Sequence, residues 1–122
     1  MNAHGNWKLE WQGVVLTIRI SGAFNQEGLI EFTDNVKSSI ASHNISKWYL
    51  LEILDAETMV TPEAMTQLKA LYEWYFENGC QSQALINNNI LQKEIALELS
   101  KARVAVFDNE TDALAHFKSL SC

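Results

Sequence analysis

Cysteine, proline and long apolar runs are all scarce in this sequence. Its 122 residues include two cysteines and one proline, and no apolar stretch approaches the length that crosses a bilayer. Cys80 and Cys122 do not make a disulfide framework in a chain without an export signal, so we expect two free thiols. The first seven residues have neither a basic region nor an apolar core, which predicts no signal peptide and a cytoplasmic location.

Basic residues are also few. The chain has 9 Lys and Arg against 15 Asp and Glu, a net charge of −6, and the basic side chains are scattered along it. Binding to nucleic acid or to an anionic membrane surface takes clustered Lys and Arg, so neither is an expected partner.

The residue patterns of common catalytic and cofactor sites are missing as well. His4, His43 and His116 do not have metal-ligand spacing, so we expect no metal site. No glycine-rich phosphate loop is present, and no cofactor is expected. Cys80 follows Gly79 and is far from any helix N-terminus that would activate its thiol, which favours a structural role over a catalytic one.

The chain does contain a regular alternation between two hydrophobic periods. Trp7, Leu9 and Trp11 alternate with polar residues, and a second alternating segment begins at Val14 after Gly13, which together predict an antiparallel hairpin. Later segments alternate between short apolar runs and helical periodicity. We expect further strands at 48–54, 83–86 and 104–107, and helices at 25–42, 61–78, 91–99 and 109–120.

This element order, β-β-α-β-α-β-α-β-α, predicts an α/β fold with a single mixed, mostly parallel sheet and helices packed on it. Because no linker, repeat or low-complexity run interrupts the chain, residues 1–122 are expected to form one domain.

The ends of the helices have recognisable signals. Asn25 and Asn109 are suited to cap their helices, and Thr61-Pro62-Glu63 has the residues of an N-cap and a first helical turn. Gly79 is expected to end the second helix in a left-handed conformation. Gly28, in the first turn of the first helix, either allows the close approach of a neighbour or ligand or is a tolerated surface glycine.

The segment from Glu52 to Glu63 has the densest group of carboxylates. It joins the carboxyl end of the central strand to a helix N-terminus, the edge at which open α/β sheets tend to bind ligands. Glu52, Asp55, Glu57 and Glu63 are candidates for acid/base chemistry, because two close carboxyl groups favour opposite protonation states. Glu63 also suits the helix dipole, and Asp55 and Glu57 suit a hydrated loop, so structural and functional interpretations both stand.

A stripe of aromatic residues marks the second helix. Tyr72, Tyr75 and Phe76, together with Trp48, are bulky enough to enclose an apolar pocket, although such a stripe is also typical of simple core packing. Trp74 lies near the edge of the stripe, where partial exposure would mark an interface. Trp74 or the edge of the first strand could support a homodimer, which nothing in the sequence requires.

Nearly the whole chain resembles the STAS domain superfamily, and more closely its SpoIIAA-like bacterial branch, which is often paired with the CRAL-TRIO lipid-exchange fold. The resemblance rests on the element order, on the strand–loop–helix at 48–78 and on three short segments. These segments are Gly22-Ala23-Phe24-Asn25, Thr61-Pro62-Glu63-Ala64 and Val106-Phe107-Asp108 with Asp112-Ala113-Leu114.

The resemblance implies a non-catalytic regulatory or binding domain. In the anti-sigma-factor antagonists of this family, a partner kinase phosphorylates the second serine of an Asp-Ser-Ser-Gly turn at the start of the second helix. Here the corresponding segment is Val60-Thr61-Pro62-Glu63, so proline occupies the acceptor position and Thr61 is a candidate phosphoacceptor displaced by one residue.

Three functions follow as hypotheses. The first is a STAS-like protein-interaction domain whose contact surface includes Asp55, Glu57, Thr61, Glu63 and Trp74. The second is a carrier or sensor of a small apolar or lipid-like ligand, held by Trp48, Tyr72, Tyr75 and Phe76. The third is an enzyme that uses the carboxylates of the 52–63 segment, which has the least support because no nucleophile, metal set or cofactor motif accompanies them.

Overall fold

The fold begins with the predicted hairpin. A computed structural model describes residues 4–86, 94, 98 and 104–120. Strands β1 (Asn6–Gln12) and β2 (Val15–Ser21) pair antiparallel, with Trp7 opposite Ile20 and Gln12 opposite Val15. Gly13 supplies the turn with a φ of 59°, a conformation that glycine adopts without steric cost.

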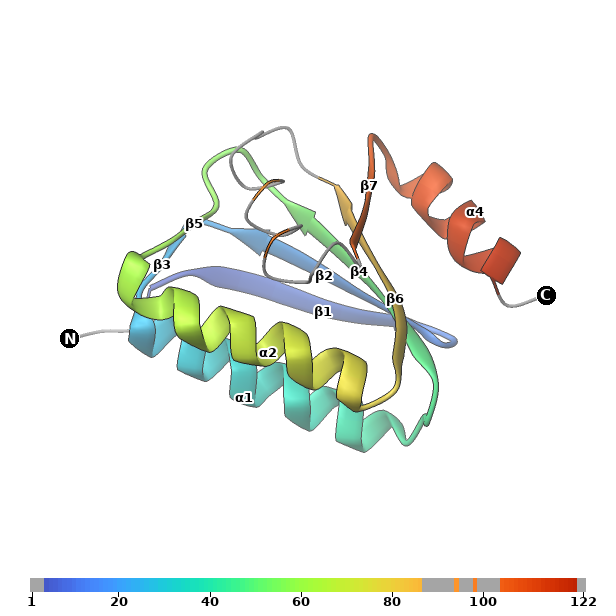
Figure 1. Ribbon diagram of the computed structural model, residues 1–122, viewed down its shortest axis with the longest axis horizontal. Helices are drawn as coiled ribbons and strands as arrows, with labels where there is room; N and C mark the ends of the chain where they lie inside the picture. Colours follow the sequence, from blue (N-terminus) through green and yellow to red (C-terminus); the bar gives the residue numbers. More distant parts are fainter. Residues whose placement is uncertain (1–3, 87–93, 95–97, 99–103, 121–122) are drawn as a thin grey trace.

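The main sheet has five strands in the order β1-β2-β4-β6-β7 (Figure 1). Strand β4 (Trp48–Leu54) lies at its centre and runs parallel to β2 and to β6 (Cys80–Ile86). Strand β7 (Val104–Phe107) pairs parallel with β6 at the edge. The predicted single mixed, mostly parallel sheet is therefore confirmed, although β6 begins earlier than predicted and includes Cys80.

A second, two-stranded sheet was not predicted. Strands β3 (Ala23–Phe24) and β5 (Met59–Val60) pair parallel with each other. Each strand has two residues, which is too short for an alternating pattern to appear in the sequence. This small sheet ties the segment after β2 to the loop after β4, and it therefore shapes the region between β4 and α2.

Helices cover both faces of the main sheet. Helices α1 (Gln26–His43) and α2 (Met65–Glu77) lie side by side on one face, and α4 (Glu110–Leu120) lies on the other (Figure 1). Gly79 follows α2 with a φ of 103°, as predicted. The helix predicted at 91–99 lies outside the described residues, apart from the isolated positions 94 and 98.

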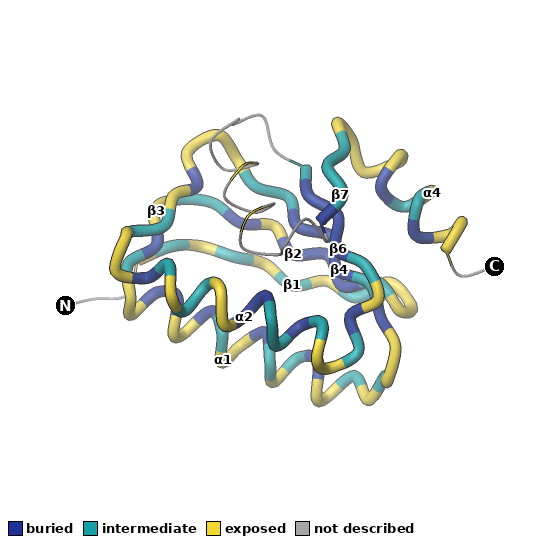
Figure 2. Tube along the Cα trace, in the orientation of Figure 1, coloured by how far each residue is buried: buried dark blue, intermediate teal, exposed yellow. Residues whose placement is uncertain are grey.

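The central strands are buried on both faces, with three consecutive buried residues at 16–18 of β2 and at 50–52 of β4; Figure 2 shows such dark segments in the sheet. Leu16, Ile18 and Leu50 are fully buried in the cluster on the α1/α2 face. Leu51 lies on the opposite face and packs in a second cluster with Phe117 of α4. Because both faces are covered, β4 is apolar at nearly every position, as expected for a central parallel strand.

Two of the three predicted helix caps are present. The Asn25 side chain accepts hydrogen bonds from the backbone N–H groups of Gly28 (2.8 Å) and His4 (2.9 Å). Asn109 Oδ1 accepts from the Asp112 N–H at 2.8 Å, and Asn109 Nδ2 donates to the Asp112 carboxylate at 3.1 Å. The bonds from Gly28 and Asp112 satisfy N–H groups that a helix N-terminus otherwise leaves without partners.

The expectation that the Thr61 side chain caps the second helix is wrong. The chain enters α2 through a short 3₁₀ turn, η1 (Pro62–Ala64), and the Thr61 side chain makes no capping hydrogen bond. The N–H of Ala64 instead bonds to the Thr61 backbone carbonyl at 3.0 Å. The 3₁₀ turn explains the difference, because its bond to the residue three positions earlier already satisfies the Ala64 N–H, and Pro62 has no N–H of its own.

Gly28 allows a close backbone approach. A Cβ atom at this position would lie 1.7 Å from the carbonyl oxygen of His4. The first of the two interpretations of Gly28 is therefore confirmed, and the neighbour is the chain itself. The segment before β1 is held against the first turn of α1 by this contact and by the bond from His4 to Asn25.

The variant Gly28→Ala tests this contact. Replacing a helical glycine by alanine usually stabilises a protein by about 0.5–1 kcal/mol. Here the methyl group has to displace backbone, so we expect a loss of about 1–3 kcal/mol in the free energy of unfolding, measured with urea. Ser38→Ala, at an exposed position of the same helix, is the control and should stay within about 0.5 kcal/mol of wild type. Equal stability of Gly28→Ala and wild type would contradict the close contact.

Candidate functional site

The loop between β4 and α2 is organised by one carboxylate. Asp55 Oδ1 accepts a hydrogen bond from the Glu57 N–H at 3.1 Å and lies 2.8 Å from the Thr58 hydroxyl. The same hydroxyl lies 3.1 Å from the backbone oxygen of Ile20. Asp55 thus holds a tight turn, and the buried Thr58 anchors the turn to β2. The structural interpretation of Asp55 therefore has specific support.

The outer side of this loop forms an exposed surface next to the N-terminal end of α2. Met59 is 63% exposed although it is a large apolar residue. Asp55, Glu57 and Glu63 are exposed beside it, and Thr61 is half-buried. We call these five residues, Asp55, Glu57, Met59, Thr61 and Glu63, the loop surface. Four of them were predicted from the sequence, and Met59 was not.

Beneath the loop lies a group of polar side chains inside the core. Glu52 of β4 is 3% exposed and Gln83 of β6 is fully buried. Gln83 Nε2 donates a hydrogen bond to the Glu52 carboxylate, and the Tyr72 hydroxyl of α2 hydrogen-bonds to the same carboxylate. We call Glu52, Tyr72, Tyr75 and Gln83 the buried polar cluster.

The electrostatics of the cluster favour a neutral carboxyl group. Burial raises the pKa of Glu52 from 4.5 to about 7, and the hydrogen bonds from Gln83 and Tyr72 lower it in part. Burial, followed by the Glu52 charge, raises the pKa of Tyr72 and of Tyr75 well above the usual value for tyrosine. The carboxyl group of Glu52 therefore changes its protonation state near neutral pH, while both tyrosines stay neutral.

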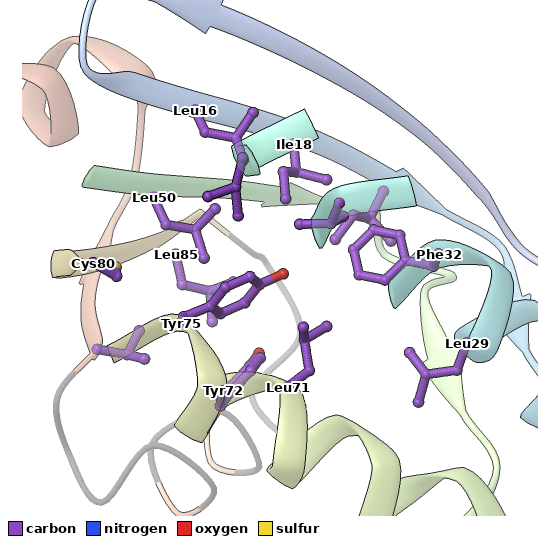
Figure 3. Packing of buried hydrophobic residues seen from close by; sticks show 14 of the residues in the cluster. Leu16, Ile18, Leu29, Phe32, Leu50, Leu71, Tyr72, Tyr75, Cys80 and Leu85 are labelled. Atoms are coloured by element: carbon purple, nitrogen blue, oxygen red, sulfur yellow. The ribbon is translucent and has the colours of Figure 1, made fainter. Parts of the chain in front are cut away.

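Two polar atoms of the cluster have no hydrogen-bond partner among the described residues. They are the hydroxyl oxygen of Tyr75 and Oε1 of Gln83. Figure 3 shows Tyr72 and Tyr75 projecting from α2 toward the sheet, among apolar side chains such as Leu50 and Leu85. An unpaired buried polar atom costs about 1–3 kcal/mol. The two unpaired atoms therefore lower the free energy of unfolding relative to a fully hydrogen-bonded cluster.

A cavity of about 50 Å³ lies beside Glu52. Most of its wall is apolar and comes from β2, β3, β4, β5, α1 and α2. The polar residues that line it are Glu52, Thr58 and Tyr72. The cavity therefore connects the buried polar cluster with the inner side of the loop.

The four aromatic residues of the predicted pocket lie in different environments. Trp48 and Tyr75 are fully buried and pack edge to face, with ring centroids 5.8 Å apart. The Trp48 indole N–H donates to the backbone oxygen of Asn78 at 3.0 Å. Tyr72 lines the cavity, whereas Phe76 is half-buried at the margin of the core. Trp48 and Tyr75 thus form tightly packed core.

Trp74 is half-buried, in keeping with its place at the edge of the helical stripe. Lys37 Nζ of α1 lies 5.0 Å from the centre of its ring, within the range of a cation–π interaction. Trp74 also lines an open groove of about 390 Å³, with Ile40, Ile45 and Asn78, near the ends of α1 and α2. This groove lies at the opposite end of α2 from the loop surface.

The carboxylates of the 52–63 segment do not gather at one point. Glu52 is inside the core, Asp55 is engaged by the loop, and Glu57 and Glu63 are exposed. Sequence reasoning missed Gln83 as a partner of Glu52. A signal was available for Glu52, the one charged residue of the apolar strand β4, whereas Gln83 does not stand out in β6, where Gln81 and Ser82 precede it.

The described residues give two further findings. No helix within 4–86 or 104–120 is long and apolar enough to cross a membrane. In the same part of the chain, His, Cys, Asp and Glu residues do not form a group of three or more that could hold a metal ion.

The raised pKa of Glu52 predicts a pH-dependent stability. The folded protein binds the carboxyl proton more tightly than the unfolded chain, so this contribution is complete below about pH 4.5 and is lost as the pH rises through about 7. At about 1.4 kcal/mol per pH unit, wild type should lose about 2.5 kcal/mol relative to Glu52→Gln between pH 5 and pH 8. Urea unfolding of both proteins at several pH values measures the difference and cancels the contributions of other groups. Parallel curves would show that Glu52 is ionised in the folded protein throughout this range.

The sequence matches no protein-family model and no curated protein. Solved structures do match. An uncharacterised protein of the DUF3478 family with a SpoIIAA-like fold, from Shewanella loihica, is 17% identical over 94% of both chains, with a TM-score of 0.65. An anti-sigma factor antagonist from Mycobacterium paratuberculosis is 16% identical over 93% of both chains, with a TM-score of 0.65.

SpoIIAA itself, an anti-sigma factor antagonist described as a Bacillus cell fate determinant, matches in two forms. The unphosphorylated form is 12% identical and covers 93% of this chain and 98% of its own, with a TM-score of 0.61. The phosphorylated form is 14% identical and covers 92% and 99%, with a TM-score of 0.58. The expected resemblance is confirmed at the level of the fold: this chain has a SpoIIAA-like fold.

Proposed function

We propose that this chain is a non-catalytic regulatory domain of STAS type, which acts by binding another protein. The observation that carries the proposal is the match with anti-sigma factor antagonists along more than nine-tenths of both chains. These neighbours act on anti-sigma factors, so a protein of that class is the proposed partner. The TM-scores of 0.58–0.65 establish the shared fold, and the class of the partner is inferred from these neighbours.

The loop surface is the proposed contact site. It has an exposed apolar residue, Met59, among the carboxylates of Asp55, Glu57 and Glu63. A partial apolar centre with a charged rim is common in protein–protein interfaces. The hydrogen bonds of Asp55 and Thr58 hold the loop in place before binding, which lowers the entropy that a partner has to overcome. We expect the partner to present basic side chains around an apolar depression.

The other two hypotheses have less support. Ligand-binding pockets usually measure roughly 300–1,000 Å³, and the cavity beside Glu52 measures about 50 Å³, which is small for a lipid-like molecule. For an enzyme, general acid/base chemistry requires paired groups that reach a common substrate. Glu52 is instead enclosed in the core, and Asp55 and Glu57 lie on the loop.

Binding measurements with a charge substitution test the proposed contact site. We expect purified anti-sigma factors from the source genome to include one that binds this chain in isothermal titration calorimetry. Met59→Glu should weaken that binding at least about tenfold, because it removes the apolar centre and places a charge in the partner's apolar depression, where the carboxylate loses its hydration. Leu120→Glu is the matched control, since Leu120 is 48% exposed on α4 and should leave the affinity unchanged.

Two outcomes would count against the proposal. Binding by none of the anti-sigma factors would reject the partner class. Equal effects of Met59→Glu and Leu120→Glu would place the contact site elsewhere on the molecule.

Thr61 is the proposed phosphoacceptor of the loop surface. Its side chain makes no capping hydrogen bond, and it lies at the start of η1, where a phosphate is favoured by the N-terminal end of a helix. The carboxylates of Glu57 and Glu63 would oppose the added charge. Phosphorylation would therefore change the loop surface most strongly through electrostatics.

Mass spectrometry after incubation with ATP and a binding anti-sigma factor kinase tests this role. We expect one phosphate, located on Thr61 by fragmentation and absent from Thr61→Val. Thr66→Val is the control, because Thr66 is an exposed threonine of α2 close in sequence. A phosphate that persists in Thr61→Val would assign the acceptor to another residue.

A further inference from the structure

The cavity beside Glu52 has polar side chains on its inner wall and a short segment of the loop on its outer wall. The inner wall includes Glu52 and Tyr72, and Thr58 and Val60 line the cavity from the loop and β5. We call the segment 59–61, which follows the anchored Thr58, the cover. The cover lies over the same cavity that the buried polar cluster adjoins, so a change in the charge of Glu52 acts directly on its inner side.

Thr58 is fixed by its bonds to Asp55 and Ile20, but few backbone hydrogen bonds hold the cover that follows it. The N–H of Met59 bonds to the Gly22 oxygen and the N–H of Thr61 to the Phe24 oxygen, both at 3.1 Å. These bonds belong to a sheet of two strands with two residues each. A segment held by a few hydrogen bonds near the protein surface opens at a lower free energy than the central strands of a sheet. The cover is therefore the part of the cavity wall that can move.

Among the described residues, the side chains that line the cavity beside Glu52 are neutral. Helix α1 contributes Leu29 and Phe32, β2 contributes Ile20, and Thr58 and Val60 line it from the loop and the cover. The remaining neighbours are Gln83 and the two tyrosines of the cluster, which do not titrate near neutral pH. The described side chains that line the cavity include no basic residue, so within this part of the chain an ionised Glu52 is stabilised by two hydrogen bonds and not by a paired charge.

We propose that Glu52 and its cavity form a proton-operated switch that controls the closure of the cover. With Glu52 neutral, the cover closes on a core without net charge. Loss of the proton places a charge beside the cavity, which is large enough to admit water. A cavity of this size holds too little water to hydrate the charge fully. Displacement of the cover exposes Glu52 to bulk water, and the opened state is then favoured because it hydrates the carboxylate. The exposed side of the cover is part of the loop surface, so the switch would regulate that surface, but its test needs no partner.

Linkage gives the size of the effect. In the closed protein the pKa of Glu52 is about 7, and in an opened, hydrated state it returns toward 4.5. The opening equilibrium then increases about tenfold between pH 6 and pH 8, because the opened state holds the proton less tightly. A group with the same pKa in both states would give no increase.

Amide hydrogen exchange measures this opening. After correction for the intrinsic pH dependence of exchange, we expect the protection factors of the Met59 and Thr61 amides to fall about tenfold from pH 6 to pH 8 in wild type. In Glu52→Gln, which keeps the shape of the side chain and cannot ionise, they should stay constant. The Tyr49 amide, which bonds to the Val14 oxygen at 2.9 Å near the hairpin turn, is the internal control in both proteins.

A second measurement keeps the proposal testable if Glu52→Gln does not fold. In wild type, ¹³C NMR of the Glu52 carboxyl should give a titration midpoint that coincides with the change in protection of the cover. Constant protection of Met59 and Thr61 across this pH range would overturn the proposal. So would an equal fall in Glu52→Gln, or a carboxyl group that titrates at its ordinary value.

Discussion

The burial of β4 on both faces is the constraint on which the rest of the structure depends. This strand pairs parallel with β2 on one side and β6 on the other, and α1 and α2 cover the face opposite α4. Leu50 and Leu51 are both buried although they point to opposite faces. Leu50 belongs to the core cluster under α1 and α2, and Leu51 belongs to the cluster under α4. The two clusters therefore lie on the two faces of β4.

The same burial gives Glu52 its unusual chemistry. A carboxyl group in the middle of a covered strand cannot reach solvent, and its pKa rises to about 7 because the charged form is poorly hydrated. The hydrogen bonds from Gln83 and Tyr72 make the position tolerable but do not neutralise a charge. The proposed switch depends on where Glu52 lies, because β4 ends at the loop that carries the loop surface.

The architecture was largely predictable because its signals are local. The hairpin, the covered central strand and the caps at Asn25 and Asn109 are each encoded within a few consecutive residues. The sheet of β3 and β5 was not predictable, because two-residue strands have no periodicity. The residues Thr61-Pro62-Glu63 predict a side-chain cap at Thr61. In the structure, a 3₁₀ turn that begins at Pro62 pairs the Ala64 N–H with the backbone carbonyl of Thr61 instead.

The sequence by itself determined the order of the elements and the acidic, apolar and turn residues available to each of them. Only the tertiary structure decided which of these residues meet. Glu52 and Gln83 are 31 positions apart in the chain and are brought together by the register of β4 against β6. Gly28 likewise required the fold to reveal that the backbone of His4 occupies the space of its missing side chain. The physical reason is the same in both cases: hydrophobic periodicity specifies which side of an element is buried, whereas the partner on that side is set by packing between elements.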